Sequence, residues 1–142
     1  MSRVLALDIG TVRVGIAISD PSKKLALPLE SINMQKNKDV FEQIAAYCTE
    51  YDVDCVVVGL PLLMDGQARA AVRRTRRFVE GLRPYLEGMR FYGVDERLSS
   101  AAAERAMQNM GIKSRDYHRH VDSIAAALIL EGYLGGAIGE LI

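Results

Sequence analysis

The sequence has few cysteines and no long apolar run. Its 142 residues contain only Cys48 and Cys55, whose separation by six residues fits neither a zinc pair nor a redox pair. No apolar stretch approaches the ~20 residues that a membrane-spanning helix needs. The first residues enter a predicted strand directly, without the basic segment, apolar core and cleavage site of a secretion signal. We therefore expect two reduced, buried cysteines in a soluble, cytoplasmic protein with no membrane partner.

The sequence also lacks a surplus of charge of either sign, because 18 Lys and Arg residues balance 18 Asp and Glu residues. This balance argues against nucleic-acid binding by bulk charge, but it leaves local basic patches open. The composition is typical of a globular domain. Since neither an internal repeat nor a linker is visible, we expect one domain over residues 1–142.

Strand and helix patterns alternate along most of the chain. Strands are predicted at 3–7, 12–19, 24–32, 55–58 and 89–95. Helices are predicted at 39–51, 68–86, 101–110 and 121–134. The first two strands form a hairpin, the third suits a sheet edge because it contains Pro28, and the fourth is apolar enough to be central. The order predicts an α/β fold: a mixed five-stranded sheet, with three antiparallel strands and a parallel βαβ part, flanked by helices. The first strand is expected to be central.

Three acids stand at predicted element boundaries: Asp8 after the first strand, Glu96 after the last strand, and Asp122 at the start of the last helix. Open α/β sheets bind ligands at the edge where their parallel strands end. Three converging carboxylates repel one another unless a cation neutralises them, and oxygen ligands favour Mg²⁺ or Mn²⁺. One or two such ions could activate water for attack on a phosphodiester. If the acids converge, they predict a metal site.

Each acid also has an ordinary structural explanation. Asp122 is suited to cap the last helix, Glu96 could pair with Arg97, and Asp8 could be a turn residue beside Gly10. Taken together, these explanations fit the sequence less well than a shared site does. Asp8 ends an apolar strand, where an acid that merely happens to lie on the surface is not expected.

The predicted helix 68–86 has two contrasting faces. Its apolar arc consists of Ala71, Val72, Thr75, Phe78, Val79 and Leu82. The opposite arc consists of Arg69, Arg73, Arg74, Arg76 and Arg77. A charged helix face is usually just solvated, but these arginines are not interrupted by an acid. Because arginine binds phosphate in a bidentate manner, the arc favours contact with a polyanion.

A second basic cluster leads directly into Asp122. Its members are Lys113, Arg115, His118, Arg119 and His120. We expect a basic loop here, following a helix that ends near Gly111. The basic side chains of such a loop often only keep it soluble, but beside an acidic site they can bind a phosphate backbone.

Four segments in register resemble the YqgF/RuvX family, and the resemblance covers roughly residues 3–134. They are residues 8–17, 58–61 with 65–66, 95–99, and 121–126. The resemblance implies a ribonuclease H-like fold and a hydrolase, either a nuclease that matures the 5′ end of pre-16S rRNA or a Holliday-junction resolvase. It also implies that Asp8, Glu96 and Asp122 are catalytic, metal-binding acids for Mg²⁺ or Mn²⁺, with the backbone turn at Gly10 and Thr11 beside them.

The chain departs from the family pattern in three ways. Leu63 stands where many relatives have Asn, and His120 stands where Lys is frequent. No second acid follows Asp122 by one turn, so the sequence supports the binding of one ion better than the binding of two. The partner is expected to be structured RNA (pre-rRNA) or branched DNA, and the protein to be a monomer or a homodimer.

Two alternatives are of other classes. The chain could be a non-catalytic nucleic-acid-binding module of ribosome assembly. The segment 8–15 also resembles the phosphate-binding hairpin of actin-like and sugar-kinase-like ATP-binding domains, although these normally need two such domains. The apolar tail at 138–142 is expected to dock either on the body of the protein or on a partner.

Overall fold

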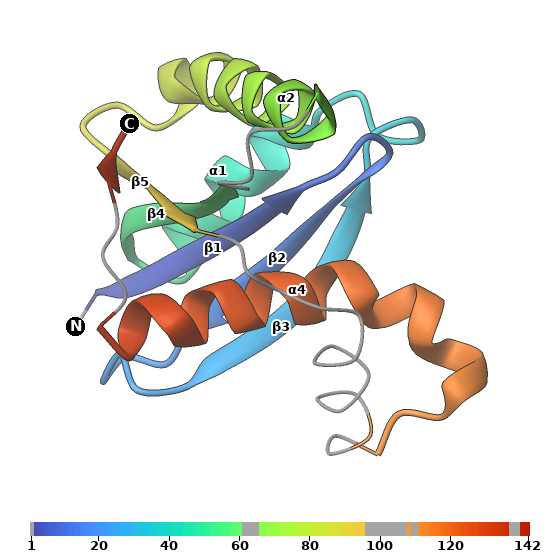
Figure 1. The fold of residues 1–142 in the computed structure, drawn as a ribbon. Helices are drawn as coiled ribbons and strands as arrows, with labels where there is room; N and C mark the ends of the chain where they lie inside the picture. The colour runs from blue at the N-terminus through green and yellow to red at the C-terminus, as the bar shows by residue number, and fades with distance from the viewer. Residues whose placement is uncertain (1, 61–65, 96–107, 109–110, 137–139) are drawn as a thin grey trace.

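A single mixed sheet organises the protein. The computed structural model describes residues 2–60, 66–95, 108, 111–136 and 140–142 (Figure 1). In chain order, the elements are β1 (Arg3–Ile9), β2 (Arg13–Ser19), β3 (Ala26–Asn33), α1 (Val40–Glu50), β4 (Val53–Leu60), α2 (Gly66–Leu82), β5 (Arg90–Asp95), α4 (Tyr117–Leu134) and β6 (Glu140–Leu141), with 3₁₀ turns at Arg83–Tyr85 and Ser114–Asp116.

The five predicted strands are confirmed, and the sheet order is β3-β2-β1-β4-β5-β6. The hairpin of β1 and β2 is antiparallel, while β1, β4 and β5 run parallel. As expected, β1 lies inside the sheet and β3, which contains Pro28, lies at an edge. The sixth strand, β6, was not predicted as a strand and pairs antiparallel with β5. Because β1, β4 and β5 are parallel, they all end at the same edge, which we call the carboxyl edge.

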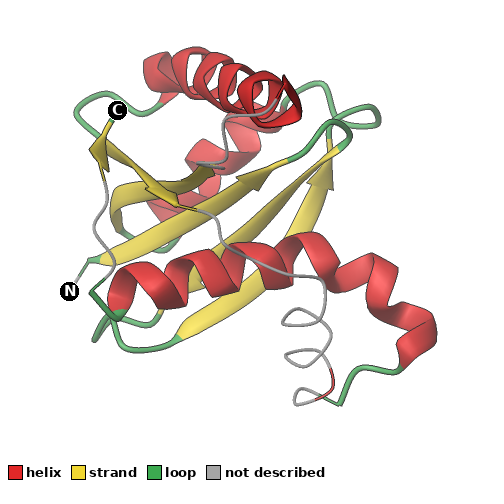
Figure 2. Ribbon diagram, viewed as in Figure 1, coloured by secondary structure: helices red, strands yellow, loops and turns green. Residues whose placement is uncertain are grey.

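Helices cover both faces of the sheet (Figure 2). One buried cluster joins Leu5 and Leu7 of β1 to side chains of α1 and α2, among them Ile44 and Phe78. The other joins the alternate β1 residues to α4. The strand period of two therefore sends odd-numbered β1 residues toward α1 and α2, and even-numbered ones toward α4.

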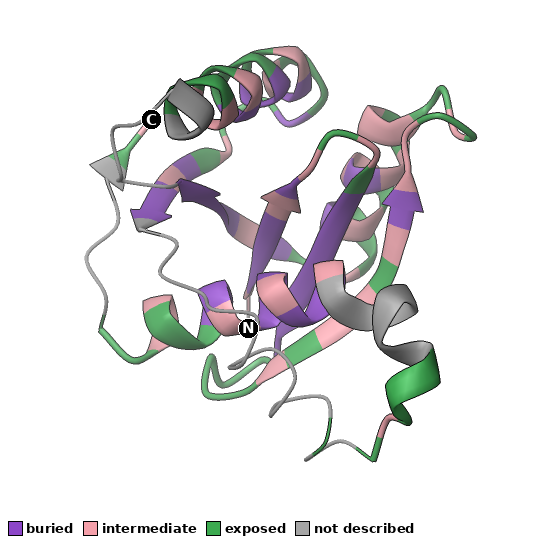
Figure 3. Cartoon of the chain, turned by 45° about the vertical axis from the view of Figure 1, so that its right-hand side comes forward, coloured by how far each residue is buried: buried purple, intermediate pink, exposed green. Residues whose placement is uncertain are grey.

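The layer between the sheet and α4 is built from small side chains. Ala6 and Ala17 are paired across β1 and β2, and both lie against the α4 cluster that contains Ala126. All three are fully buried. Strands β1, β2 and β4 are buried over most of their length (Figure 3). Small side chains allow the helix backbone to approach the sheet closely, and this close approach positions the candidate site.

Two helix boundaries differ from the prediction. Helix α4 begins at Tyr117, four residues before the expected start at 121, because its first turn is polar and shows no apolar period. Helix α2 ends at Leu82 and gives way to a 3₁₀ turn that contains Pro84, since proline cannot donate a backbone hydrogen bond to continue the helix. The predicted helix at 101–110 lies outside the described residues except for residue 108.

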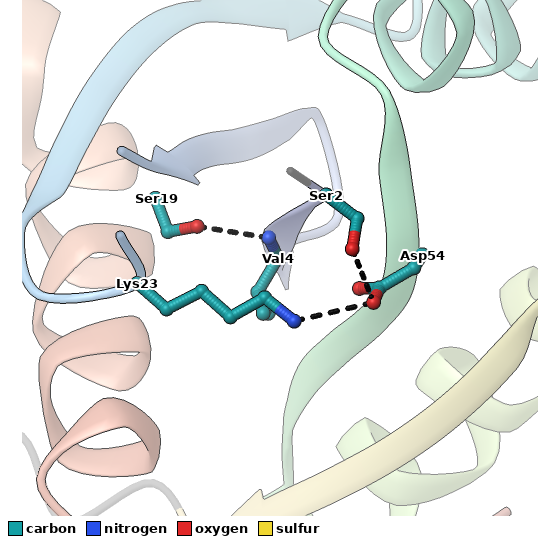
Figure 4. A network of polar contacts seen from close by, with 5 residues as sticks. All are labelled: Ser2, Val4, Ser19, Lys23 and Asp54. Carbon is teal, nitrogen blue, oxygen red and sulfur yellow. Dashed lines mark hydrogen bonds and ion pairs between the residues drawn. The ribbon is translucent and has the colours of Figure 1, made fainter. Parts of the chain in front are cut away.

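A polar network fixes the end of β1 that is opposite the carboxyl edge (Figure 4). The Ser2 hydroxyl donates to Asp54 Oδ2 at 2.7 Å, and Lys23 Nζ donates to the same oxygen at 3.2 Å. The buried Ser19 hydroxyl accepts a hydrogen bond from the Val4 amide at 2.9 Å. These contacts tie β1 to β2 and β4, and so help to hold the strand that carries Asp8 in register.

The end of the tail docks on the body of the protein. The Ile142 amide donates to the Phe91 carbonyl at 2.9 Å, and the Arg83 guanidinium donates to the Ile142 carbonyl. Ile142 also packs against the core cluster beneath α2.

Cys48 and Cys55 are free and buried, as expected. In the described part of the chain, none of the helices combines the length and the apolar character that crossing a membrane would require.

Candidate functional site

Asp8 lies near the carboxyl end of the central strand and faces α4. Val4 and Ala6 belong to the α4 cluster, whereas Leu5 and Leu7 belong to the opposite cluster. Strand alternation therefore directs the half-buried Asp8 side chain toward the α4 face. The residue paired with Asp8 across the hairpin is Gly15, which consequently projects toward the same face.

Gly15 brings α4 against this strand pair. A Cβ atom built on Gly15 would overlap the carbonyl oxygen of Asp122 and would lie 3.0 Å from the amide nitrogen of Ser123. The backbone of α4 thus occupies the space that any side chain at position 15 would need. The backbones of two predicted acids, Asp8 on β1 and Asp122 on α4, therefore both lie next to Gly15 on the α4 face of the sheet. Asp122 lies in the second turn of α4, so the alternative that it caps this helix is wrong.

The third acid cannot be placed, because Glu96 lies outside the described residues. It directly follows Asp95, the last residue of β5. Asp95 pairs with Leu60 at the end of β4, so β5 ends at the carboxyl edge. Within the described ranges, no cluster of three or more His, Cys, Asp or Glu side chains is assembled that could hold a metal ion.

The predicted turn beside the acids is present. The Gly10 amide donates to the Arg13 carbonyl at 2.9 Å, which closes the link between β1 and β2. A Cβ atom on Gly10 would lie 2.9 Å from that same carbonyl oxygen, so the tight turn requires glycine. Thr11 is exposed at the tip of the turn.

The two arcs of α2 are present, although Ala71 and Val72 of the apolar arc are only half-buried. Thr75, Phe78, Val79 and Leu82 are buried against the sheet. Arg69, Arg73, Arg76 and Arg77 are exposed, and Arg74 is half-buried. The described residues form two ion pairs, Lys23–Asp54 and Arg83–Glu80, and neither involves these five arginines. Helix α2, however, covers the face of the sheet opposite to α4, so its arginines and the Asp8–Asp122 pair lie in different layers (Figures 1 and 2).

The second basic cluster is less of a loop than expected. Lys113 and Arg115 are exposed just before α4, and Arg115 lies in a 3₁₀ turn. His118, Arg119 and His120 belong to the first turns of α4, so the expectation of a loop there is wrong. Their side chains are not described. Leu63 lies outside the described residues.

Gly15 and Ser123 are site neighbours that were not predicted from the sequence. A lone glycine inside a strand pattern is a known signal of close backbone approach, so Gly15 could have been identified. Ser123 had no such signal. It is only 5% exposed, and its hydroxyl is one of three buried side-chain atoms without a hydrogen-bond partner among the described residues.

The amino-acid sequence is similar to a known family. A model of the family described as RuvX, Holliday junction resolvase, matches residues 2–136. A relative from Roseiflexus sp. is 39% identical over 132 residues, which cover 93% of each chain. A relative from Acetivibrio thermocellus is 41% identical over 133 residues, which cover 93% of this chain and 94% of the relative. Both relatives carry the name "Putative pre-16S rRNA nuclease".

The fold is similar to solved resolvase structures. Thermus thermophilus RuvC in complex with a Holliday junction substrate superposes with a TM-score of 0.62 and 14% identity, over 100% of both chains. Fowlpox virus resolvase with Holliday junction DNA superposes with a TM-score of 0.57 and 12% identity, over 94% of this chain and 97% of that one. At these identities the likeness concerns the fold alone. The expected ribonuclease H-like fold is confirmed.

Proposed function

The chain belongs to the RuvX family, and from this membership and the placement of Asp8 we propose that it is a metal-dependent nuclease that hydrolyses phosphodiester bonds. The observation that carries the proposal is the contact between Gly15 and the Asp122 backbone, which brings two acids to one face at the carboxyl edge of the sheet. That edge is where open α/β sheets bind ligands.

Asp8, Asp122 and Glu96 are the proposed catalytic acids. Asp8 is held by the central strand and Asp122 by α4, so the distance between their backbones depends on the packing of α4 on the hairpin. Glu96 directly follows β5, and its position has the same parity along the chain as Tyr92 and Val94, which face α4. The three acids would share the work of holding a divalent cation.

The residues fit a hard cation. Carboxylate oxygens are the ligands that Mg²⁺ and Mn²⁺ prefer, and carboxylates that converge on one site need a neutralising charge. When bound, one or two such ions would supply activation of water and stabilisation of charge on the leaving oxygen. The protein's own contribution is to orient the scissile phosphate against Asp8 and Asp122. Lys113 and Arg115, which are exposed before α4, would bind phosphates on the same side of the sheet.

Pre-16S rRNA is the favoured substrate, and its cleavage would mature the 5′ end of this RNA. Relatives that cover more than nine-tenths of the chain carry the name of a pre-16S rRNA nuclease. The family description favours a second candidate, cleavage of a Holliday junction. A cytoplasmic location follows from either role. The phosphate contacts do not discriminate between RNA and DNA, so only a direct comparison of substrates separates the two.

The central experiment is to add Mn²⁺ to a chelated sample and measure cleavage of two substrates, a pre-16S rRNA fragment and a four-way DNA junction. Asp8→Asn should abolish cleavage and Mn²⁺ binding, while the circular dichroism spectrum stays that of the wild type. Asp52→Asn is the matched control, because Asp52 is exposed and has a left-handed φ of 54° that asparagine also tolerates. Full activity of Asp8→Asn would remove the metal model. Salt-dependent binding without cleavage by the wild type would favour a non-catalytic module.

A further inference from the structure

The exposed arginines of α2 form a stripe that is separate from the candidate catalytic face. Arg69, Arg73, Arg76 and Arg77 are spaced by four, three and one residues, so they lie along one side of the helix. They span about 12 Å at ~1.5 Å of rise per residue. Measured along the axis of a duplex, this length corresponds to about three or four phosphates of one strand, at ~3.4 Å of axis per phosphate. We call these four residues the arginine stripe.

The sheet and α2 itself separate the stripe from Asp8. Phe78 and Val79, on the inner side of α2, pack with Leu5 and Leu7, whereas Asp8 has the opposite parity on β1 and faces α4. With its side chains α2 is about 10 Å thick, so its outer surface stands at least that far from the sheet. Phosphates that neighbour the cleaved bond cannot reach the stripe from the α4 face.

The stripe nevertheless has the chemistry of a phosphate-binding surface. Its guanidinium groups make neither of the two ion pairs among the described residues. Arginine that is not held by an acid can bind phosphate with two parallel hydrogen bonds. An ordinary solvated helix face typically mixes acids with bases, whereas the exposed face of α2 carries these four arginines and one acid, Glu80, which pairs with Arg83. Charge complementarity therefore points to a polyanion as the partner.

We propose that the arginine stripe binds a second segment of the nucleic-acid substrate, distinct from the segment that is cut on the α4 face. This inference rests on the proposed function, because it assumes that the cut is made at Asp8 and Asp122. The substrate then has two helical segments that pass around the carboxyl edge of the sheet. A straight duplex as long as one such segment engages only one of the two surfaces.

The test compares two-armed and one-armed probes on the Asp8→Asn chain, which keeps the probes intact. The probes are a four-way DNA junction, a folded RNA with two helical arms, and a single arm of each. Affinity is measured against salt concentration. Arg73→Ala/Arg77→Ala should lower the slope of log affinity against log salt by about two for the two-armed probes, at ~0.9 per phosphate contact, and by much less for the single arms. Comparing the DNA probes with the RNA probes shows which of the two nucleic acids the arginine stripe binds.

The control removes two charges elsewhere. Lys24→Ala/Arg90→Ala takes away two exposed cations near the edge of the sheet opposite the carboxyl edge, and it should leave all slopes unchanged. An equal loss for one-armed and two-armed probes in the arginine variant would overturn the proposal, because both surfaces would then hold the same segment. An unchanged slope for every probe would overturn it too.

Crosslinking gives an independent measurement. A photoreactive residue in place of the exposed Ala70 of α2 should crosslink to the arm that is not cut. Crosslinks confined to the nucleotides next to the cut would contradict the proposal.

The failure of the nuclease function and the failure of the second binding surface can be told apart. If the wild-type chain cuts no probe, but the arginine variant still lowers the salt slope more for two-armed than for one-armed probes, the nuclease function fails while the second binding surface stands. If it cuts and the slopes do not differ between probes, the nuclease function stands while the second binding surface fails.

Discussion

The backbone carbonyl of Asp122 lies where a side chain on Gly15 would be. This contact joins α4 to the β1–β2 hairpin at the row that contains Asp8. It makes a glycine, rather than any acid, the residue that sets how closely the backbone of α4 approaches the strand that carries Asp8. The packing at this row and the polar groups around it have measurable consequences.

Gly15→Ala should destabilise the protein and disrupt the site together. The added methyl group must push α4 away from the hairpin, at a cost of at least the ~1–3 kcal/mol that is typical of overpacking. Denaturant unfolding measures the loss of stability, and calorimetric titration with Mn²⁺ measures the loss of binding. Gly88→Ala is the control, because a Cβ there meets no atom within 4 Å and only the left-handed φ of 77° opposes it. Equal effects of the two variants would contradict the close contact.

Ser123→Ala should raise the free energy of unfolding by up to about 1 kcal/mol. The substitution removes a buried hydroxyl that has no partner in the described part of the chain, and it introduces a better helix former. Ser19→Ala is the matched comparison at another buried serine on this layer, and it should lose about 1–3 kcal/mol because the Val4 amide is left without its acceptor. Urea denaturation of both variants measures the two changes. A loss of stability in Ser123→Ala would mean that the hydroxyl is bonded in solution.

Asp20 should make stability depend on pH in the acid range. Its carboxylate accepts hydrogen bonds from the Leu25 and Lys24 amides and from the Ser22 hydroxyl, and these bonds lower its pKa from 3.8 to about 2. Because the folded pKa lies below the unfolded one, the contribution is complete above pH 3.8 and is lost as the pH falls through about 2. Carboxyl NMR titration measures this pKa directly. An Asp20→Asn variant with the same acid dependence as the wild type would rule out this contribution.

Cys48 should be nearly inert in the folded protein. Burial raises the pKa of its thiol from 9.0 to about 12, which leaves roughly a thousandfold less thiolate at neutral pH. In a Cys55→Ala variant, which has Cys48 as its single thiol, a disulfide reagent should therefore react slowly under native conditions and rapidly in urea. Equal rates in the two conditions would show that the α1 side of the core opens readily.

The fold was largely predictable from the sequence because its strands carry clear periods. Val14, Ile16 and Ile18 alternate with small residues, and the run at 55–58 is continuously apolar, so both strands were recognised. The start of α4 was missed because its first turn is polar. Strand β6 is only two residues long, too short to show a period.

The site was only partly predictable. Strand ends identify Asp8 as a residue at the carboxyl edge, but a sequence pattern contains no distance between a strand and a helix that lies far along the chain. The contact at Gly15 supplies that distance. Likewise, the sequence showed that the arginines share one arc, but only the packing of Phe78 with Leu5 shows that this arc belongs to the other layer.

The contact between Gly15 and α4 also matters for protein engineering. Because backbone packs against backbone at Gly15, exposed side chains outside this contact can be exchanged without moving the backbone at Asp8 or Asp122. The outward side chains of α2 and those at 113 and 115 are exposed and play no part in this contact. A library of variants at those positions could therefore be screened for changed nucleic-acid binding on a backbone that stays constant.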